Sequence, residues 1–151
     1  MNKVQLIRVA LIDDHDLLRN GICKFLESFG LQIVFEAGNG EEALGELKKV
    51  ASLPDICIID INMPIMSGLE TTKVLTRCYP GIKVLAFSVN DDESDVFGML
   101  DNGAVGYILK GADPDELYHA IKVVHSGRKY FSQGVLKIAE KYFTGQQDRI
   151  H

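Results

Sequence analysis

Short apolar runs alternate along the chain with longer segments in which apolar residues recur every three or four positions. The short runs are rich in Val, Ile and Leu and contain few polar residues, which is typical of strands covered on both faces of a parallel sheet. Five of them predict strands, at residues 7–12, 32–36, 56–60, 83–87 and 105–109. The second run is flanked by polar residues, which predicts an edge strand.

The longer segments predict amphipathic helices between the strands. Five helices are expected, at about residues 16–29, 39–51, 67–79, 92–102 and 113–125. Ser67 can cap the third helix, since Glu70 follows three residues later as in a capping box. Asp113 before Pro114 is a typical N-cap followed by proline at the first helical position.

This alternation of strands and helices predicts an α/β fold of the (βα)5 type. Right-handed crossovers between parallel strands give a doubly wound sheet, and the flavodoxin-like strand order 2-1-3-4-5 is expected for five strands. We expect one domain over residues 1–127, followed by a linker-like tail over residues 128–151. The tail contains an amphipathic pattern around residues 135–143, which predicts a short helix.

Polar side chains follow four of the five predicted strands. The first strand leads into Asp13 and Asp14, and the third ends at Asp60. Ser88 follows the fourth strand and Lys110 the fifth. Because ligands of open α/β sheets bind beyond the carboxyl ends of the strands, we expect these five side chains to meet at one edge.

Three neighbouring carboxylates repel one another unless a cation neutralises them, and oxygen ligands favour Mg²⁺. A bound Mg²⁺ would also screen the charge of an incoming phosphoryl group. Lys110 and Ser88 can donate to phosphoryl oxygens, so the pattern predicts that Asp60 attacks phosphorus and forms an acyl phosphate. Each residue alone has an ordinary explanation, such as helix capping or a solvated loop, but their convergence favours a site.

The composition of the chain disfavours several other classes of function. The chain has 16 Lys and Arg against 21 Asp and Glu, a net charge of −5, which disfavours direct binding to nucleic acid. Three widely spaced cysteines form no zinc pattern and suit a reducing compartment. The apolar runs are too short to span a bilayer and the start of the chain carries no signal-peptide pattern, so we expect a cytoplasmic protein without membrane contact.

Four segments carry a family resemblance: VALIDDH at 9–15, PDICIIDINMPIMSG at 54–68, VLAFS at 84–88 and GAVGYILK at 103–110. In this order they resemble the receiver domain of two-component response regulators, and the first and last segments are most similar to the NarL/FixJ branch. Regulators of that branch normally continue into a LuxR-type helix-turn-helix domain. The sequence ends at His151 without one, which leaves two alternatives: a part of a longer protein or a single-domain form. We favour the first and expect the protein to reach DNA only through that missing domain.

The resemblance implies that Asp60 is the phosphoacceptor and that a sensor histidine kinase is the donor. It further implies that Asp14, Asp60 and the main-chain carbonyl of Asn62 bind Mg²⁺, with Asp13 acting through water. Ser88 and Tyr107 would form the conformational switch. A homodimer that depends on phosphorylation is a further expected partnership, with the faces of the fourth and fifth helices as the first candidate surface.

Other functions remain open at this point. A haloacid-dehalogenase-like phosphatase also uses a strand-terminal Asp nucleophile with Mg²⁺, but it needs an acid where this chain has Asn62. A flavodoxin-like cofactor binder would need a phosphate-binding loop after the first strand, where the acidic residues 13–16 would repel phosphate. A receiver-like domain that acts only through protein contacts is a third alternative, which the intact set of acids, hydroxyl and lysine disfavours.

Overall fold

Six strands and six helices alternate along the described part of the chain. The structure, a computed structural model, describes residues 6–111 and 113–150, with side chains described as far as residue 145. The strands are β1 (Arg8–Ile12), β2 (Gln32–Ala37), β3 (Ile56–Ile59), β4 (Lys83–Ser88), β5 (Gly106–Leu109) and β6 (Tyr130–Phe131). The helices are α1 (Asp16–Ser28), α2 (Gly40–Lys49), α3 (Gly68–Cys78), α4 (Glu93–Asp101), α5 (Pro114–His125) and α6 (Leu136–Ile150). Among the described residues, none of these helices is both long and apolar enough to cross a membrane.

All strands of the sheet are parallel, in the order β2-β1-β3-β4-β5-β6. The predicted order 2-1-3-4-5 is therefore confirmed, and so is the prediction that the second strand lies at an edge. Ile12 pairs with Ile59 and Ser88 pairs with Leu109, so neighbouring strands end at nearly the same level. This register brings the residues after the strands to one edge of the sheet, as expected.

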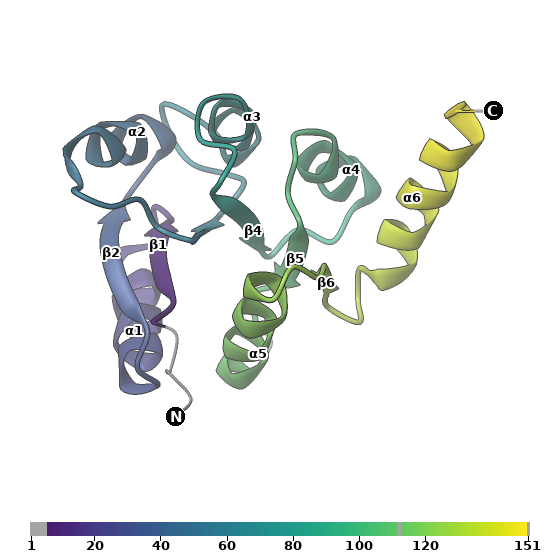
Figure 1. Cartoon of the computed structure of the whole chain (residues 1–151). Coiled ribbons are helices and arrows are strands. Elements are labelled where there is room, and N and C mark those ends of the chain that lie inside the picture. The colour runs from purple at the N-terminus through teal and green to yellow at the C-terminus, as the bar shows by residue number, and fades with distance from the viewer. Residues whose placement is uncertain (1–5, 112, 151) are drawn as a thin grey trace.

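Helices cover both faces of the sheet (Figure 1). One apolar cluster joins the sheet to α1 and α5, through side chains such as Leu26 and Ile121. The other cluster joins the opposite face to α2, α3, α4 and α6, through side chains such as Leu47 and Leu75. The continuous apolar strands in the sequence are explained by this two-sided cover: all four residues of β3 are buried.

Side-chain caps define the starts of four helices. Asn39, Ser67, Asp92 and Asp113 each accept a hydrogen bond from a main-chain N–H in the first turn of the following helix. These bonds satisfy donors that have no partner within the helix, which confirms the helix starts expected at Ser67 and Asp113. The first two helices end one and two residues earlier than the pattern predicts.

The tail forms a further strand and a long helix on the α4 side of the molecule (Figure 1). The strand β6 extends the sheet beyond β5 and was not predicted. The predicted helix at residues 135–143 exists, but it continues to the end of the described residues. It packs on α4, where the Tyr142 hydroxyl lies 2.8 Å from a carboxylate oxygen of Asp101 and Lys141 Nζ lies 2.9 Å from Glu93 Oε1.

Candidate functional site

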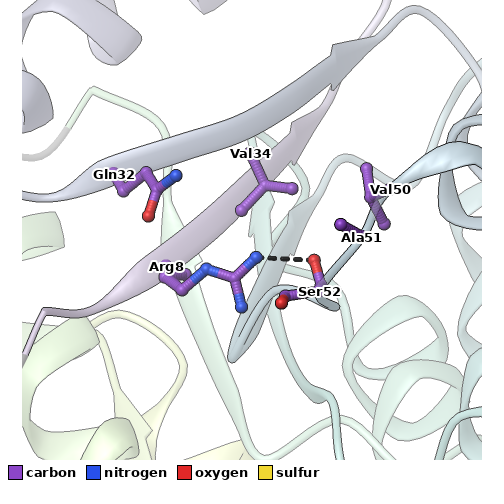
Figure 2. A pocket seen from close by; sticks show the side chains of 6 residues that line it. All are labelled: Arg8, Gln32, Val34, Val50, Ala51 and Ser52. Atoms are coloured by element: carbon purple, nitrogen blue, oxygen red, sulfur yellow. Dashed lines mark hydrogen bonds between the residues drawn. The ribbon is translucent and has the colours of Figure 1, made fainter.

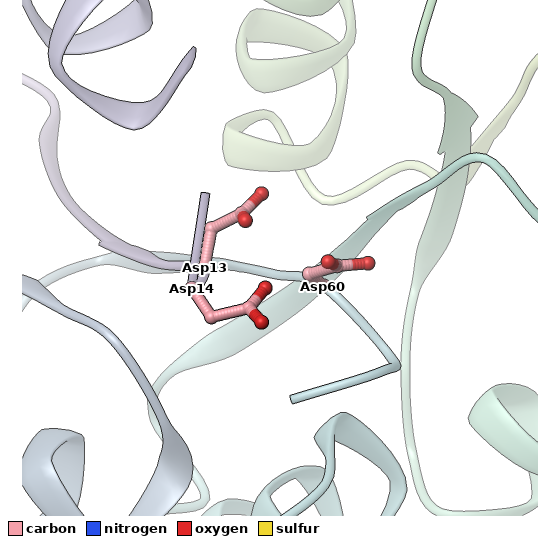
Figure 3. A group of neighbouring side chains, drawn as sticks. All are labelled: Asp13, Asp14 and Asp60. Carbon is pink, nitrogen blue, oxygen red and sulfur yellow. The ribbon is translucent and has the colours of Figure 1, made fainter. Parts of the chain in front are cut away.

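Asp13, Asp14 and Asp60 meet at the carboxyl edge of the sheet. Asp13 and Asp14 directly follow β1, and Asp60 directly follows β3 (Figure 3). Carboxylate oxygens from the three side chains lie within 4.8 Å of one another. Asp13 and Asp60 are buried, whereas Asp14 is exposed, so the cluster opens to solvent on the Asp14 side.

Lys110 supplies the positive charge of this cluster. Its Nζ atom lies 2.6 Å from Asp13 Oδ2 and 3.1 Å from Asp60 Oδ2. Burial alone would lower the pKa of this ammonium group, but the hydrogen bonds and charges of the two carboxylates outweigh burial and raise it. Lys110 is therefore a fixed cation, and one cation among three carboxylates leaves the cluster with an excess of negative charge.

Asp60 has an unfavourable environment for its own charge. Burial raises the pKa of its carboxyl group above the ordinary value, and the nearby Asp13 adds to this, although Lys110 acts in the opposite direction. Asp60 Oδ1 also accepts a hydrogen bond from the N–H of Ile61 at 2.8 Å. An additional cation beside Asp60 would relieve this unfavourable charge, which is the electrostatic condition for a metal site.

Gly68 determines how closely the β3–α3 connection can return to Asp60. Its N–H donates to the Ile61 carbonyl at 2.8 Å. A Cβ atom at Gly68 would overlap the main-chain oxygen of Asp60. Only glycine permits this approach. The residue stands in the segment that carries the family resemblance, but a sequence pattern alone does not reveal this contact.

Ser88 and Tyr107 are linked through Asn90. The Ser88 hydroxyl accepts a hydrogen bond from the Asn90 N–H at 3.1 Å, and the Tyr107 hydroxyl donates to the Asn90 carbonyl at 2.5 Å. Both side chains are fully buried. Tyr107 thus already has an inward orientation in this structure. Burial raises the pKa of its hydroxyl, which stays protonated and able to donate.

The predicted site residues therefore form two groups. The three aspartates and Lys110 form one cluster, whereas Ser88 and Tyr107 meet at the neighbouring β4–α4 connection. Asn62 lies exposed on the loop after Asp60.

Comparison with known proteins gives one family. The model of the response regulator receiver domain matches residues 9–122. The response regulator GacA of Pseudomonas viridiflava is 40% identical over 143 residues, which make up 93% of this chain and 66% of GacA. The nitrate/nitrite response regulator protein NarP of Escherichia coli is 39% identical over 129 residues, or 85% of this chain and 59% of NarP. This chain thus spans 66% or less of these two curated relatives.

Solved structures agree with this result. A two-component response regulator of the LuxR family from Aurantimonas sp. has a TM-score of 0.83 and 29% identity, and the match covers 91% of this chain and 98% of that one. The receiver domain of the putative response regulator NarL from Mycobacterium tuberculosis has a TM-score of 0.75 and 34% identity, with coverage of 83% and 100%.

Proposed function

Because this chain belongs to the response regulator receiver domain family, we propose that it accepts a phosphoryl group on Asp60 in a Mg²⁺-dependent reaction and thereby switches conformation. One observation carries this proposal. Asp60 lies beside both an ammonium group and two further carboxylates, at the edge of the sheet where α/β proteins bind ligands. A receiver domain is a phosphoacceptor and not a turnover enzyme, which removes the phosphatase alternative.

The donor set fits Mg²⁺. Asp14 and Asp60 would supply carboxylate oxygens directly, the Asn62 carbonyl would supply a third protein oxygen, and Asp13 would act through water. Support comes from the close approach of the three carboxylates and from the raised pKa of Asp60. A bound Mg²⁺ neutralises the acidic cluster and the charge of the phosphoryl oxygens.

Phosphoryl transfer then requires little from the protein beyond position and charge. A carboxylate oxygen of Asp60 attacks phosphorus in line with the leaving group. The new O–P bond forms as the bond to the donor breaks, and the leaving group departs with its electron pair. Lys110 and the Ser88 hydroxyl donate to the phosphoryl oxygens. Attack by water on the acyl phosphate later releases phosphate and restores Asp60.

We propose that Ser88 couples this chemistry to the rest of the molecule. To reach a phosphoryl oxygen its hydroxyl must reorient, which disturbs its hydrogen bond with Asn90. Tyr107 is bonded to the same residue, so the change reaches the β4–α4 connection and α4. The tail helix packs on α4 and would experience this change as well.

The proposed partners follow from the family. The protein is expected to lie in the cytoplasm, where a sensor histidine kinase would donate the phosphoryl group. The output is expected to be transcription, through a C-terminal LuxR-type DNA-binding domain beyond the receiver at residues 1–127 and the linker-like tail at 128–151. One solved structure similar to this chain is described as two RcsB dimers bound to two parallel DNAs, which supports a homodimer here as a proposal. We propose that this homodimer depends on phosphorylation.

Incubation with acetyl phosphate and Mg²⁺, followed by intact mass measurement, tests the proposal. We expect the parent chain to gain one phosphoryl group, and Asp60→Asn to gain none because it lacks the nucleophile. Omission of Mg²⁺ should also prevent the gain. A parent chain that stays unlabelled, or an Asp60→Asn variant that is labelled equally, would contradict the proposal.

A further inference from the structure

Arg19 contacts two strand ends that lie next to the acidic cluster. It is in the first turn of α1, and its Nη1 atom donates to the main-chain oxygen of Asp13 after β1 and, at 3.4 Å, to that of Ala37 at the end of β2. The N–H of Asp13 donates to the same Ala37 oxygen at 2.9 Å. One guanidinium group thus joins the end of β1 to the end of β2.

Two carboxylates hold the guanidinium in this position. Arg19 Nε lies 3.1 Å from Glu36 Oε1, and Nη2 lies 3.1 Å from Asp16 Oδ1. The arginine side chain is only 15% exposed, whereas those of Asp16 and Glu36 are 83% and 39% exposed. The planar guanidinium holds its donors in a rigid fork that binds several acceptors in fixed directions, whereas the three donors of an ammonium group rotate freely on a flexible stem.

The Asp13 oxygen that Arg19 binds belongs to the peptide unit between Asp13 and Asp14. The orientation of this unit helps to set where the backbone directs the Asp14 side chain, because the Cα atom of Asp14 belongs to the same planar peptide group. The Asp13 carboxylate is held separately, by the His15 N–H at 2.8 Å and by Lys110 at 2.6 Å. The Asp14 side chain is exposed, so the peptide orientation is its main constraint.

We propose that Arg19 is a positioning residue of the metal site, which fixes the Asp13–Asp14 peptide so that the Asp14 carboxylate points into the acidic cluster. The inference rests on the proposed function, because it concerns the Mg²⁺ that the receiver uses. Arg19 touches neither the metal nor the phosphoryl group. Its contribution is to arrange an acidic ligand before the cation arrives, so that binding requires less reordering of the loop.

Titration of the folded chain with Mg²⁺ by isothermal calorimetry tests this role. In Arg19→Gln the Kd for Mg²⁺ should rise about tenfold, the lower end of the usual effect of losing a residue that orients metal ligands. Arg19→Lys keeps the positive charge and the aliphatic stem but loses the planar guanidinium group. It should therefore recover only part of the affinity for Mg²⁺. Exposed Arg77 on α3 provides the matched control, and Arg77→Gln should bind Mg²⁺ as the parent does.

The rate of labelling by acetyl phosphate distinguishes weaker Mg²⁺ binding from a loss of phosphoryl-transfer activity. At low Mg²⁺ the Arg19→Gln variant should be labelled slowly, and saturating Mg²⁺ should restore the rate to near that of the parent. A purely structural role would lower the unfolding temperature without changing the Kd of the folded protein. If Arg19→Gln does not fold, Arg19→Lys provides the same comparison.

A Kd for Mg²⁺ that rises less than about threefold in Arg19→Gln, or not at all in Arg19→Lys where only that variant folds, would overturn the inference, while a larger rise supports it. This outcome is distinct from failure of the proposed function. If the parent binds Mg²⁺ and is labelled but the Arg19 variants bind equally well, only the positioning role is lost. If the parent neither binds Mg²⁺ nor is labelled, the proposed function itself is wrong.

Discussion

The two ends of the sheet differ in what they offer a ligand. At the amino end, a cavity of about 500 Å³ is lined by Arg8, Gln32, Val34, Val50, Ala51 and Ser52 (Figure 2). Arg8 uses its guanidinium there to bind the carbonyl oxygens of Ser52 and Leu53, at 2.5 and 2.7 Å. At the carboxyl end, three carboxylates converge with one lysine.

Both ends thus contain an arginine that binds main-chain oxygens near β1, but only the carboxyl end gathers three acidic side chains into one cluster among the described residues. The guanidinium of Arg8 in the cavity at the amino end holds the α2–β3 connection in place through the Ser52 carbonyl oxygen. The size of a cavity therefore does not mark the site here. An excess of like charge, which a bound cation would relieve, does so.

The largest expected effect is on the rate of phosphorylation, when the cationic side chain at each end of the sheet is replaced. Lys110→Met removes a donor that stabilises the transferred phosphoryl group, so the rate of labelling by acetyl phosphate at saturating Mg²⁺ should fall about a hundredfold. Arg8→Met at the amino end should leave this rate within about twofold of the parent, since distant sites act independently. Equal rates in Lys110→Met and the parent would remove the basis for assigning the site to the carboxyl end.

The second difference concerns pH. Burial, together with Asp13, raises the pKa of Asp60, so the native chain still holds this proton at pH values where the unfolded chain has released it. The free energy of unfolding of the parent should therefore fall as pH rises from the ordinary pKa of an aspartate through the raised value. Asp60→Asn lacks this titration, and without Mg²⁺ it should gain stability relative to the parent across that window. Urea unfolding at several pH values measures the difference, and parallel pH profiles for the two proteins would contradict it.

The smallest expected effect comes from backbone strain at the carboxyl end. Ile65, in the loop after Asp60, has a φ of 69° and is 75% exposed. A β-branched residue in this left-handed region is unfavourable by about 1–2 kcal/mol, and the exposed side chain recovers little of this by packing. Ile65→Gly should therefore stabilise the chain, by about 1 kcal/mol or less once the flexibility of glycine is counted.

Val89 provides the control for this substitution. It is 71% exposed and lies in the β4–α4 loop of the same edge, but its φ is negative. Val89→Gly should leave stability unchanged or lower it, because it relieves no strain. The two variants are compared by thermal unfolding, and a loss of stability in Ile65→Gly would mean that the loop conformation is not strained.

These regions also show what a sequence can and cannot predict. The four-residue strand β3 and the acidic Asp60 after it were predictable, because a buried parallel strand leaves an uninterrupted apolar run and its carboxyl end has a known place in the sheet. The two-residue strand β6 was not predicted, because Tyr130 and Phe131 are too few to establish a period.

Other features could not be predicted from the sequence, for related reasons. Arg19 joins the ends of β1 and β2, and its partners become neighbours only after the sheet has formed. The left-handed backbone of Ile65 runs against the preference of its own side chain, so local propensity would predict a different conformation. The acidic cluster and Lys110 were predictable from strand ends alone, whereas the contacts of Arg19 beside the cluster were not.

The most direct test of the central claim is to locate the phosphoryl group among the three clustered aspartates. Borohydride reduction of the chain labelled by acetyl phosphate and Mg²⁺ converts the acyl phosphate to an alcohol, and peptide mass spectrometry identifies the residue. The modification is predicted at Asp60 alone, with Asp13 and Asp14 unmodified. A modification at Asp13 or Asp14, or at a residue outside the cluster, would contradict the assignment of Asp60 as the nucleophile.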